Sequence, residues 1–366
     1  MSNMDLSCYA PTFSIKIGGE PQPELERAVI SISVDESIEK ASMFTISLNE
    51  GLDLKTQTFK WLDNKILDPT HDQEVEICVG YVNSKEQSRE PTIIGVITSL
   101  EPSFPSSGIP SLKVSGYDNS LRLQRPMARD KKTFDNENNY ADIVKKIAKK
   151  YNLGEGDIDP VFKPPETITQ DNESNDYKFL HDLANSVKYE FFVRGKKLYF
   201  RKPRDQAKET RSLRWGREII SFNPNMNTAK AVCKVTVRGH NPNDPSKPII
   251  GVATSKDQNF KETKAKSAAE LVKAKRELEI PYRNVSSEEE AKALAKGLLI
   301  RANNGFIEGT CECIGIPEIK AGTNIRIEGI GKRFSGRYYI KGVRHSIGES
   351  GYTLSLSVRR GGVGTI

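Results

Sequence analysis

Histidine, a side chain often used for acid–base and metal chemistry, occurs at four positions: His71, His181, His240 and His345. None of them belongs to an HExxH pair or stands beside a candidate serine or cysteine nucleophile, and no GxSxG elbow is present. No GxGxxG or P-loop follows a predicted strand, so no phosphate-binding loop is indicated. His181 falls between helical core positions, and we expect a partly exposed helix residue there.

The acidic and amide run at 171–176 resembles the beginning of a calcium-binding loop. Such a loop needs glycine at its sixth position and glutamate at its twelfth, where this sequence has Asp176 and Asp182. The run therefore predicts a hydrogen-bonded turn that caps a helix, rather than a calcium site.

Three nearby carboxylates, Glu166, Asp171 and Glu173, could in principle be paired for glycoside cleavage. No aromatic residues are spaced to form a cleft that holds a sugar. The sequence therefore predicts no catalytic set, no cofactor site and no metal site.

Five cysteines are present, an odd number without a CxxC pair: Cys8, Cys78, Cys233, Cys311 and Cys313. Cys311 and Cys313 lie two apart in a strand-like run, so both should point to the same face. We predict reduced structural thiols, with a metal or redox role as the alternative.

The chain has 366 residues, which favours two or three domains. Its charged fraction of 28% and hydrophobic fraction of 36% are typical of a globular protein. No apolar run approaches the roughly 18 residues of a membrane span, and the polar start at 1–12 lacks a secretory signal, so folding in a cytoplasm is expected. The net charge of +7 invites a nucleic-acid partner, but 48 acidic residues are interspersed with 55 basic ones.

The first third of the chain alternates apolar and polar residues with period two, which predicts antiparallel strands in a barrel or sandwich. The predicted strands are 13–17, 29–34, 44–48, 75–79, 93–97 and 112–117.

The pattern changes at Asp118. A helix is predicted from Asn138 or Asn139, which can cap it, to about Tyr151, and a second one after Asn175. A hairpin of 189–194 and 198–201 follows, so 118–204 reads as a small α+β domain.

Strands resume at Leu213 and include 219–222 and 232–239. The Lys/Glu-rich stretch 241–278 predicts a solvated connector. A capping box at 286–289 opens a helix to Ala302 that Gly305 ends. The last four predicted strands are 307–314, 324–329, 337–347 and 352–359.

Two distant segments repeat one pattern. Gly-Val-x-x-Ser-aliphatic occurs at 95–100 and again at 342–347. A similar alternating strand follows each, at 112–115 and 354–357, and a similar one precedes each, at 75–77 and 325–327. A duplicated β domain in a trimer would present six similar units in a ring, which can match a sixfold partner with threefold symmetry.

Two clusters in the middle of the chain resemble a known family. One comprises 120–125, 133–134 and 140–148, and the other is the run Asn-Glu-Ser-Asn-Asp-Tyr-Lys-Phe-Leu at 172–180 with Leu183 and Ala184. Both resemble the phage late-control D family of tail baseplate hub proteins. That family is similar to the hub part of VgrG tip proteins and of extracellular contractile injection system hubs. The family run "NESD-aromatic-x-FL" has an extra asparagine here, and the resemblance spans about 13–359.

The resemblance implies an α+β, mainly β fold with two similar antiparallel β-barrel-like tube domains and a smaller α+β middle domain. The first tube domain would span 1–117 and the middle domain 118–209 and 241–306. The second tube domain would be split between 210–240 and 307–360, with a C-terminal tail at 361–366.

The function implied is that of a non-enzymatic structural hub in the baseplate at the tail tip of a virion or injection particle, assembled in the bacterial host cytoplasm. Such a hub is a homotrimer that forms a pseudo-hexameric ring and acts as a symmetry adaptor. It joins a hexameric tail tube protein to a trimeric spike protein, with tape-measure and baseplate wedge or adaptor proteins as further partners. Because the sequence stops soon after its last predicted strand, the spike is expected to be a separate polypeptide, with no lytic domain fused.

Tube docking is predicted at two hairpins that correspond under the duplication, through Leu100, Glu101, Phe104, Ile347 and Tyr352. A tail-associated cell-wall hydrolase and a DNA-binding virion protein are the alternatives. No membrane and no specific nucleic acid are expected as partners.

Overall fold

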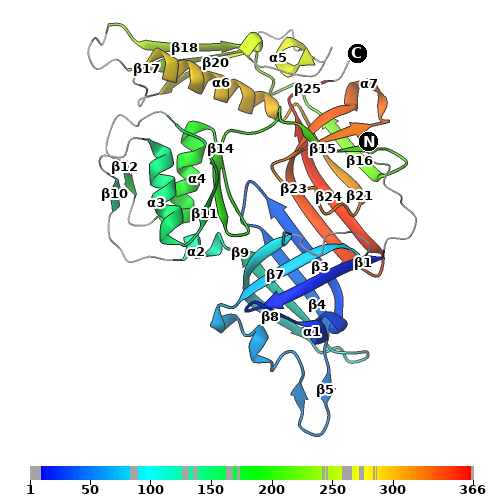
Figure 1. The fold of residues 1–366 in the computed structure, drawn as a ribbon. Coiled ribbons are helices and arrows are strands. Elements are labelled where there is room, and N and C mark those ends of the chain that lie inside the picture. The colour runs from blue at the N-terminus through cyan, green and yellow to red at the C-terminus, as the bar shows by residue number, and fades with distance from the viewer. Residues whose placement is uncertain are drawn as a thin grey trace.

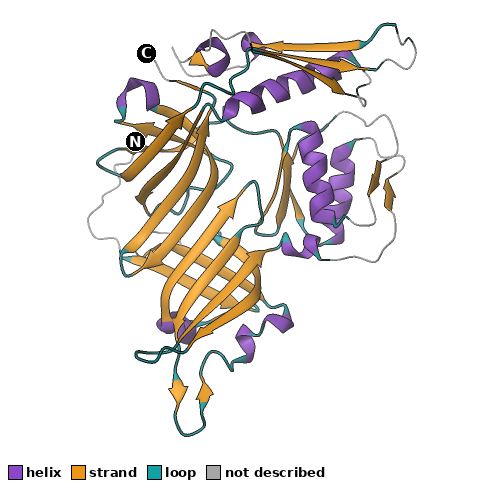
Figure 2. Ribbon diagram, turned by 180° about the vertical axis from the view of Figure 1, so that it is seen from behind, coloured by secondary structure: helices purple, strands orange, loops and turns teal. Residues whose placement is uncertain are grey.

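The computed structural model describes residues 10–82, 90–125, 132–134, 139–161, 168–170, 174–240, 244, 246–257, 266–271, 276–282, 285 and 287–363. Two β modules lie side by side, and α/β parts cover one flank and one end of them (Figures 1 and 2). The predicted mainly β fold class with two similar β modules is confirmed.

The first β module contains the strands predicted in the first third of the chain. They are β1 (Pro11–Ile17), β3 (Val29–Ser37), β4 (Met43–Asn49), β7 (Glu74–Tyr81), β8 (Ile93–Ser103) and β9 (Ser111–Asp118). Their apolar alternation becomes alternating burial, as in Ile32 and Val34 of β3. Neighbouring strands pair in the order β3-β4-β9-β8-β7-β1.

Short elements decorate this module at its turns. They are β2 (Glu20–Pro21), α1 (Pro23–Ala28), the hairpin of β5 (Leu52–Asp53) and β6 (Thr58–Phe59), and the 3₁₀ turns η1 (Lys65–Leu67) and η2 (Pro69–His71).

The second β module contains β15 (Glu209–Arg214), β16 (Ile219–Met226), β21 (Ile307–Ile314), β22 (Asn324–Glu328), β23 (Gly336–Gly348) and β24 (Gly351–Arg360). Its neighbours pair in the order β16-β21-β24-β23-β22-β15. The short helix α7 (Gly331–Phe334) lies between β22 and β23, and β25 (Gly362–Val363) follows β24.

The two modules share one strand order. Taken in chain order, the strands of one correspond to those of the other, and the two pairing orders are then identical. The first strand is the exception in direction, because β1 pairs antiparallel with β7 whereas β15 pairs parallel with β22.

The register also corresponds. A bulge interrupts β8–β9 between Ile97 and Ser99, and β23–β24 between Ile340 and Gly342. Aligning these bulges matches 112–115 with 354–357, and 75–77 with 325–327, as the sequence pattern predicted.

The glycine part of the predicted repeat is wrong in register. With the bulges aligned, Gly95 corresponds to Tyr338, and Gly342 corresponds to Ser99. The Gly-Val-x-x-Ser pattern therefore recurs four residues out of step. Gly95 is needed for close packing, since a Cβ there would lie 2.1 Å from the Tyr117 carbonyl oxygen.

The modules are joined edge to edge. β3 of the first pairs antiparallel with residues 342–347 of β23 in the second, which makes one 13-stranded sheet. One hydrophobic cluster runs through both modules. The second half of β23 therefore lies between β24 and a strand of the other module.

The predicted small α+β domain is also present. α3 (Tyr140–Lys150) and α4 (Asp176–Val187) pack on the sheet of β11 (Gly154–Ile158), β13 (Glu190–Arg194) and β14 (Lys197–Arg201). The predicted caps are confirmed, since the side chain of Asn139 accepts from Ala141 N and that of Asn175 from Lys178 N. Shorter elements are α2 (Leu121–Gln124), β10 (Lys132–Phe134) and β12 (Ile168–Gln170).

A further small sheet departs from the predictions. β17 (Lys234–Gly239) pairs with β18 (Ile249–Thr254) and β20 (Glu277–Tyr282), and α6 (Glu288–Asn304) covers them. The connector predicted at 241–278 therefore contains β18 and the start of β20, besides shorter elements. Within the segment 210–240, which we assigned to the second tube domain, β17 pairs outside that module.

The remaining short elements of this part are η3 (Ser255–Asp257), β19 (Lys266–Ser267) and α5 (Ala268–Leu271). The capping box of α6 is one residue later than predicted, because the Ser287 hydroxyl accepts from Glu290 N and Ser286 lies outside the described residues. Along the described chain, no helix is long and apolar enough to cross a membrane.

Candidate assembly surfaces

The histidines lie on separate elements. His71 is beside Asp68 at 3.3 Å, and His181 contacts Asn185 on α4 at 2.9 Å, partly exposed as predicted. His345 is buried in β23, and His240 is exposed after β17. Within the described ranges, no three His, Cys, Asp or Glu side chains are grouped so as to hold a metal ion.

Cys311 and Cys313 both point into the core, as their spacing predicted. Burial raises the pKa of the Cys311 thiol to about 12 and shifts that of Cys313 in the same direction. Both are therefore protonated thiols at neutral pH and poor nucleophiles.

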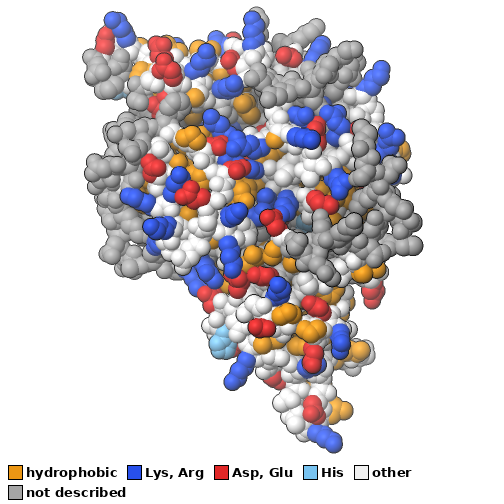
Figure 3. All heavy atoms as spheres, viewed as in Figure 1, with side chains coloured by type: hydrophobic (Ala, Val, Ile, Leu, Met, Phe, Trp, Pro, Cys, Tyr) orange, Lys and Arg blue, Asp and Glu red, His pale blue; other side chains and the backbone are white. Residues whose placement is uncertain are grey.

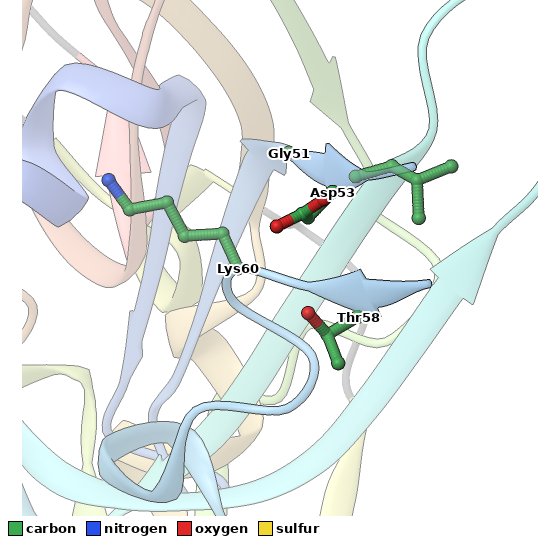
Figure 4. A pocket seen from close by; sticks show the side chains of 5 residues that line it. Gly51, Asp53, Thr58 and Lys60 are labelled. Atoms are coloured by element: carbon green, nitrogen blue, oxygen red, sulfur yellow. The ribbon is translucent and has the colours of Figure 1, made fainter. Parts of the chain in front are cut away.

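A shallow hollow lies at the β5–β6 hairpin and is lined by Gly51, Leu52, Asp53, Thr58 and Lys60 (Figure 4). Asp53 accepts from the Lys55 and Thr56 amides, whose hydrogen bonds lower its pKa. Lys60 extends away and pairs with Glu24 at 3.1 Å. These groups hold a turn together and offer no acid–base pair.

Acidic and basic side chains are interspersed over the face shown in Figure 3. No field of one sign large enough to follow a nucleic-acid backbone is visible on that face.

The aspartate of the family-like run is a structural node. Asp176 is fully buried and accepts from the Lys150 ammonium and the Tyr151 hydroxyl at 2.7 Å, and from Gln170 Nε2 at 2.8 Å. It ties β12 and the end of α3 to the start of α4, which fits the predicted helix-start turn. The neighbouring residues 171–173 of the run, and Glu166, lie outside the described residues.

A buried charged cluster joins the β13–β14 hairpin to the second β module. Glu190 accepts from the Tyr339 hydroxyl at 2.5 Å and pairs with Arg359 at 3.2 Å. Arg359 also contacts Asp205 at 3.3 Å and stacks over the Tyr339 ring. Burial raises the pKa of Glu190, which Arg359 opposes, and burial beside Glu190 raises that of Tyr339.

Two arginines of the same hairpin extend this joint. Arg194 pairs with Glu36 of β3 and donates to the Ala321 carbonyl. Arg201 bridges Asp157 and the Gly322 carbonyl, both at 2.8 Å. The α/β part is therefore fixed to both β modules at once, a feature that sequence reasoning missed because its partners lie far apart in the chain.

The five residues predicted for tube docking differ in exposure. Phe104 is 57% exposed, Glu101 is exposed and pairs with Lys113 at 3.0 Å, and Leu100 is half-buried. Ile347 and Tyr352 lie opposite each other in β23–β24 and are only 8% and 5% exposed. Their side chains are buried within one chain, since Ile347 lies beside Ile32 of β3 and the Tyr352 ring packs against Tyr81 and His345. Tube docking through the five residues stays a prediction.

Several strand edges lack a second ladder partner, and two of them are related by the duplication to the paired edges of β3 and β23. β16 forms a ladder with β21 alone, apart from a bridge between Trp215 and Ile219, and residues 99–103 of β8 form a ladder with β9 alone, with η2 beside β8, as far as the described residues extend. Large apolar side chains are exposed near these edges: Trp215, Ile220, Phe104 and Ile109. Exposed apolar surface at an open edge is typical of an interaction site.

Comparison with known proteins supports this view of the fold. Residues 8–349 match the family of the Alg8 N-terminal domain. A comparison with curated proteins finds no match.

Solved structures share the fold at low sequence identity. The 43 kDa tail protein of prophage MuSo2 from Shewanella oneidensis is 16% identical with a TM-score of 0.67, and the match covers 96% of this chain and 98% of that one. The tail protein from Neisseria meningitidis MC58 is 14% identical with a TM-score of 0.65, covering 96% and 97%. An E. coli component of the type VI secretion system, described as similar to T4 bacteriophage tail proteins gp27 and gp5, is 13% identical with a TM-score of 0.52, covering 90% and 73%. The predicted resemblance to phage tail proteins is confirmed at the level of the fold.

Proposed function

Because the chain belongs to the family of the Alg8 N-terminal domain and has a fold shared with phage tail proteins, we propose that it is a structural baseplate hub. In this role it forms a trimer whose β modules make a pseudo-hexameric ring between a hexameric tail tube and a trimeric spike.

The observation that carries the proposal is the duplicated module. Two units with one pairing order and matching bulges stand edge to edge in each chain. Three chains supply six such units, so a threefold assembly offers a nearly sixfold face to the tube. The two modules are the tube domains of this proposal, and the α/β parts are the side that meets the spike.

The charged joint supports a mechanical role. Glu36, Glu190 and Arg201 are each less than a tenth exposed. Across the contact between the α/β part and the β modules, Glu36 and Glu190 form ion pairs with arginines and Arg201 donates to the Gly322 carbonyl. Such contacts are strongly destabilised when one partner is lost, so they fix one relative placement of the parts. A hub that transmits force between tube and spike needs that rigidity.

The proposed hub is not an enzyme. We place the hub in the baseplate at the tail tip, built in the bacterial host cytoplasm, beside tube, spike, tape-measure and wedge or adaptor proteins.

The test is to locate the protein in particles purified from cells that express it. Antibody against this chain should label the tip of the tail in electron micrographs, and deletion of its gene should leave tails unassembled. Label along the sheath or on the capsid would refute the hub.

Two further assays separate the alternatives. Peptidoglycan zymography of the purified chain should show no clearing, and clearing that one carboxylate substitution abolishes would favour the hydrolase. Tight duplex binding with a steep salt dependence would favour the DNA-binding protein.

A further inference from the structure

We propose that the open edge of β16 meets the open half of β8 in a neighbouring copy of this chain, as β3 meets β23 inside one chain. This inference rests on the proposed ring and names the surfaces that would close it.

The contact inside one chain supplies the template. β3 runs antiparallel to β23 with Val34 opposite His345, and Ile38 N donates to the Lys341 carbonyl at 3.1 Å. Arg344 pairs with Asp35 across the ladder at 2.7 Å. The edge of one module is thereby completed by the first long strand of the other.

Because the two modules correspond strand by strand, an equivalent contact can form between two copies of the chain. β16 corresponds to β3, since both carry a bulge at the same place, at Ile220 and at Ile30. Residues 99–104 correspond in the same way to 342–347 of β23. The second module therefore has a strand, β16, that is equivalent to β3. The first module has an edge, at residues 99–104, that is equivalent to the edge of β23 with which β3 pairs.

Side chains at the two unpaired edges are more exposed than their counterparts at the β3–β23 contact, which is expected if the unpaired edges lack a partner in the single chain. Ile347 is 8% exposed under β3, whereas its counterpart Phe104 is 57% exposed. Ile220 is 58% exposed, whereas its counterpart Ile30, beside the β23–β24 turn, is 37% exposed. A contact with a neighbouring copy that buries Phe104 and Ile220 would remove much of this difference in exposure.

Transferring the register predicts the opposed residues. Phe104 would lie opposite Phe222, and Glu101 opposite Asn225, whose amide can donate to the carboxylate in place of the Arg344–Asp35 pair. Pro102 would lie opposite Pro224 at the counterpart of the hydrogen-bonded pair His345–Val34. Neither proline can donate, so side chains must supply most of the affinity.

The same prolines protect the free chain. An open strand edge is a template for indiscriminate pairing, and proline blunts it. A specific contact then depends on the apolar side chains that a second copy of the chain places opposite the edge.

The two edges belong to different modules and lie well apart in Figure 1, β16 in the upper module and β8 in the lower one. They cannot meet within one chain, so the contact is head to tail between copies. Repetition of one module-to-module contact closes a ring of six units from three chains. This contact replaces the tube-docking role predicted for Leu100, Glu101 and Phe104.

A disulfide tests the contact directly. Ser103 and Asn223 are the counterparts of Ser346 and Ser33, which face each other between hydrogen-bonded pairs. Cα atoms at such positions lie about 4.5 Å apart, within the range of a disulfide. The variant Ser103→Cys/Asn223→Cys should therefore migrate, after oxidation and without reductant, as three linked chains.

The matched control is Ser33→Cys/Ser346→Cys, which should close a disulfide inside one chain and migrate as a single chain with two fewer reactive thiols. Each single variant should also stay a single chain, which accounts for the native thiols Cys8, Cys78 and Cys233.

Single chains from the double variant, with the control disulfide formed, would overturn the inference. If light scattering then still gives three times the chain mass of 40.9 kDa, the ring persists through other surfaces and the proposed function survives. If the mass is that of one chain and tail tips carry no label, the proposed function fails as well. Linked chains longer than three would overturn the closed ring.

Discussion

Replacement of Arg359 by methionine tests whether the charged joint holds the α/β part on the β modules. The guanidinium contacts Glu190 at 3.2 Å and Asp205 at 3.3 Å, and its side chain is 14% exposed. Methionine keeps much of the volume but leaves two carboxylates, 8% and 18% exposed, without their shared cation. Loss of one partner from a buried pair costs about 3–5 kcal/mol. Because Glu190 keeps its bond from Tyr339, we expect about 3 kcal/mol.

The assay is urea unfolding followed by circular dichroism and by the fluorescence of Trp61, which is buried in the first module. Glu190 already has a raised pKa, and loss of Arg359 raises it further, so the folded variant binds a proton more readily than the unfolded chain. A raised pKa means that stability is lost as pH rises, so the deficit should be larger at pH 8 than at pH 5.

Adding Glu190→Gln to the variant should restore at least about 1 kcal/mol, since the uncompensated charge is gone. Lys234→Met is the control, because its pair with Glu277 is exposed to solvent, and it should change stability far less than Arg359→Met does. A loss below about 1 kcal/mol for Arg359→Met would refute the reasoning.

Three further predictions concern buried positions. Burial lowers the pKa of His345 to about 3, below its value in the unfolded chain. In urea unfolding, the stability of the wild type relative to His345→Gln should therefore fall by about 3 kcal/mol between pH 7 and pH 4, and a constant difference would contradict this. A Cβ at Gly251 would lie 2.1 Å from the Ala291 carbonyl carbon, so Gly251→Ala should speed amide exchange in 234–254, whereas Gly348→Ala should not. Asp176→Ala should lower stability by about 3 kcal/mol in thermal unfolding, against less than about 0.5 for the exposed Asp182→Ala; equal effects would exclude a buried node.

The strands and helices could be predicted from the sequence because alternation and capping depend on residues that are close together in the chain. Alternation in β3 places Ile32 and Val34 inside, and Asn139 and Asn175 each satisfy an amide of the helix that follows. Partner choice is not local. Val235 and Val237 give β17 the same alternation as its neighbours, and nothing in it tells which sheet it joins.

The repeat shows the same limit. Period two fixes which face a side chain takes, so the match of 75–77 with 325–327 held. A bulge shifts the register without a clear residue signature, so the sequence wrongly suggested that Gly95 and Gly342 occupy equivalent positions. The charged joint left one signal that we did not use: Glu190 directly precedes a run of buried apolar residues, where an acidic side chain needs a partner.

The places where the two modules differ bear on the symmetry of the proposed ring. One large insertion, 119–208, separates the modules, and another, 227–306, lies between β16 and β21, where the first module has only the short turn 38–42. The insertions contact each other, since Arg301 of α6 donates to Asn185 of α4 at 3.2 Å. Neither interrupts β3, β16 or the paired half of β23, so the edges proposed for ring closure are left free. Each chain thus carries one α/β side for two β modules, and three chains would present three such sides around six modules, which is the mismatch between spike and tube that a hub must bridge.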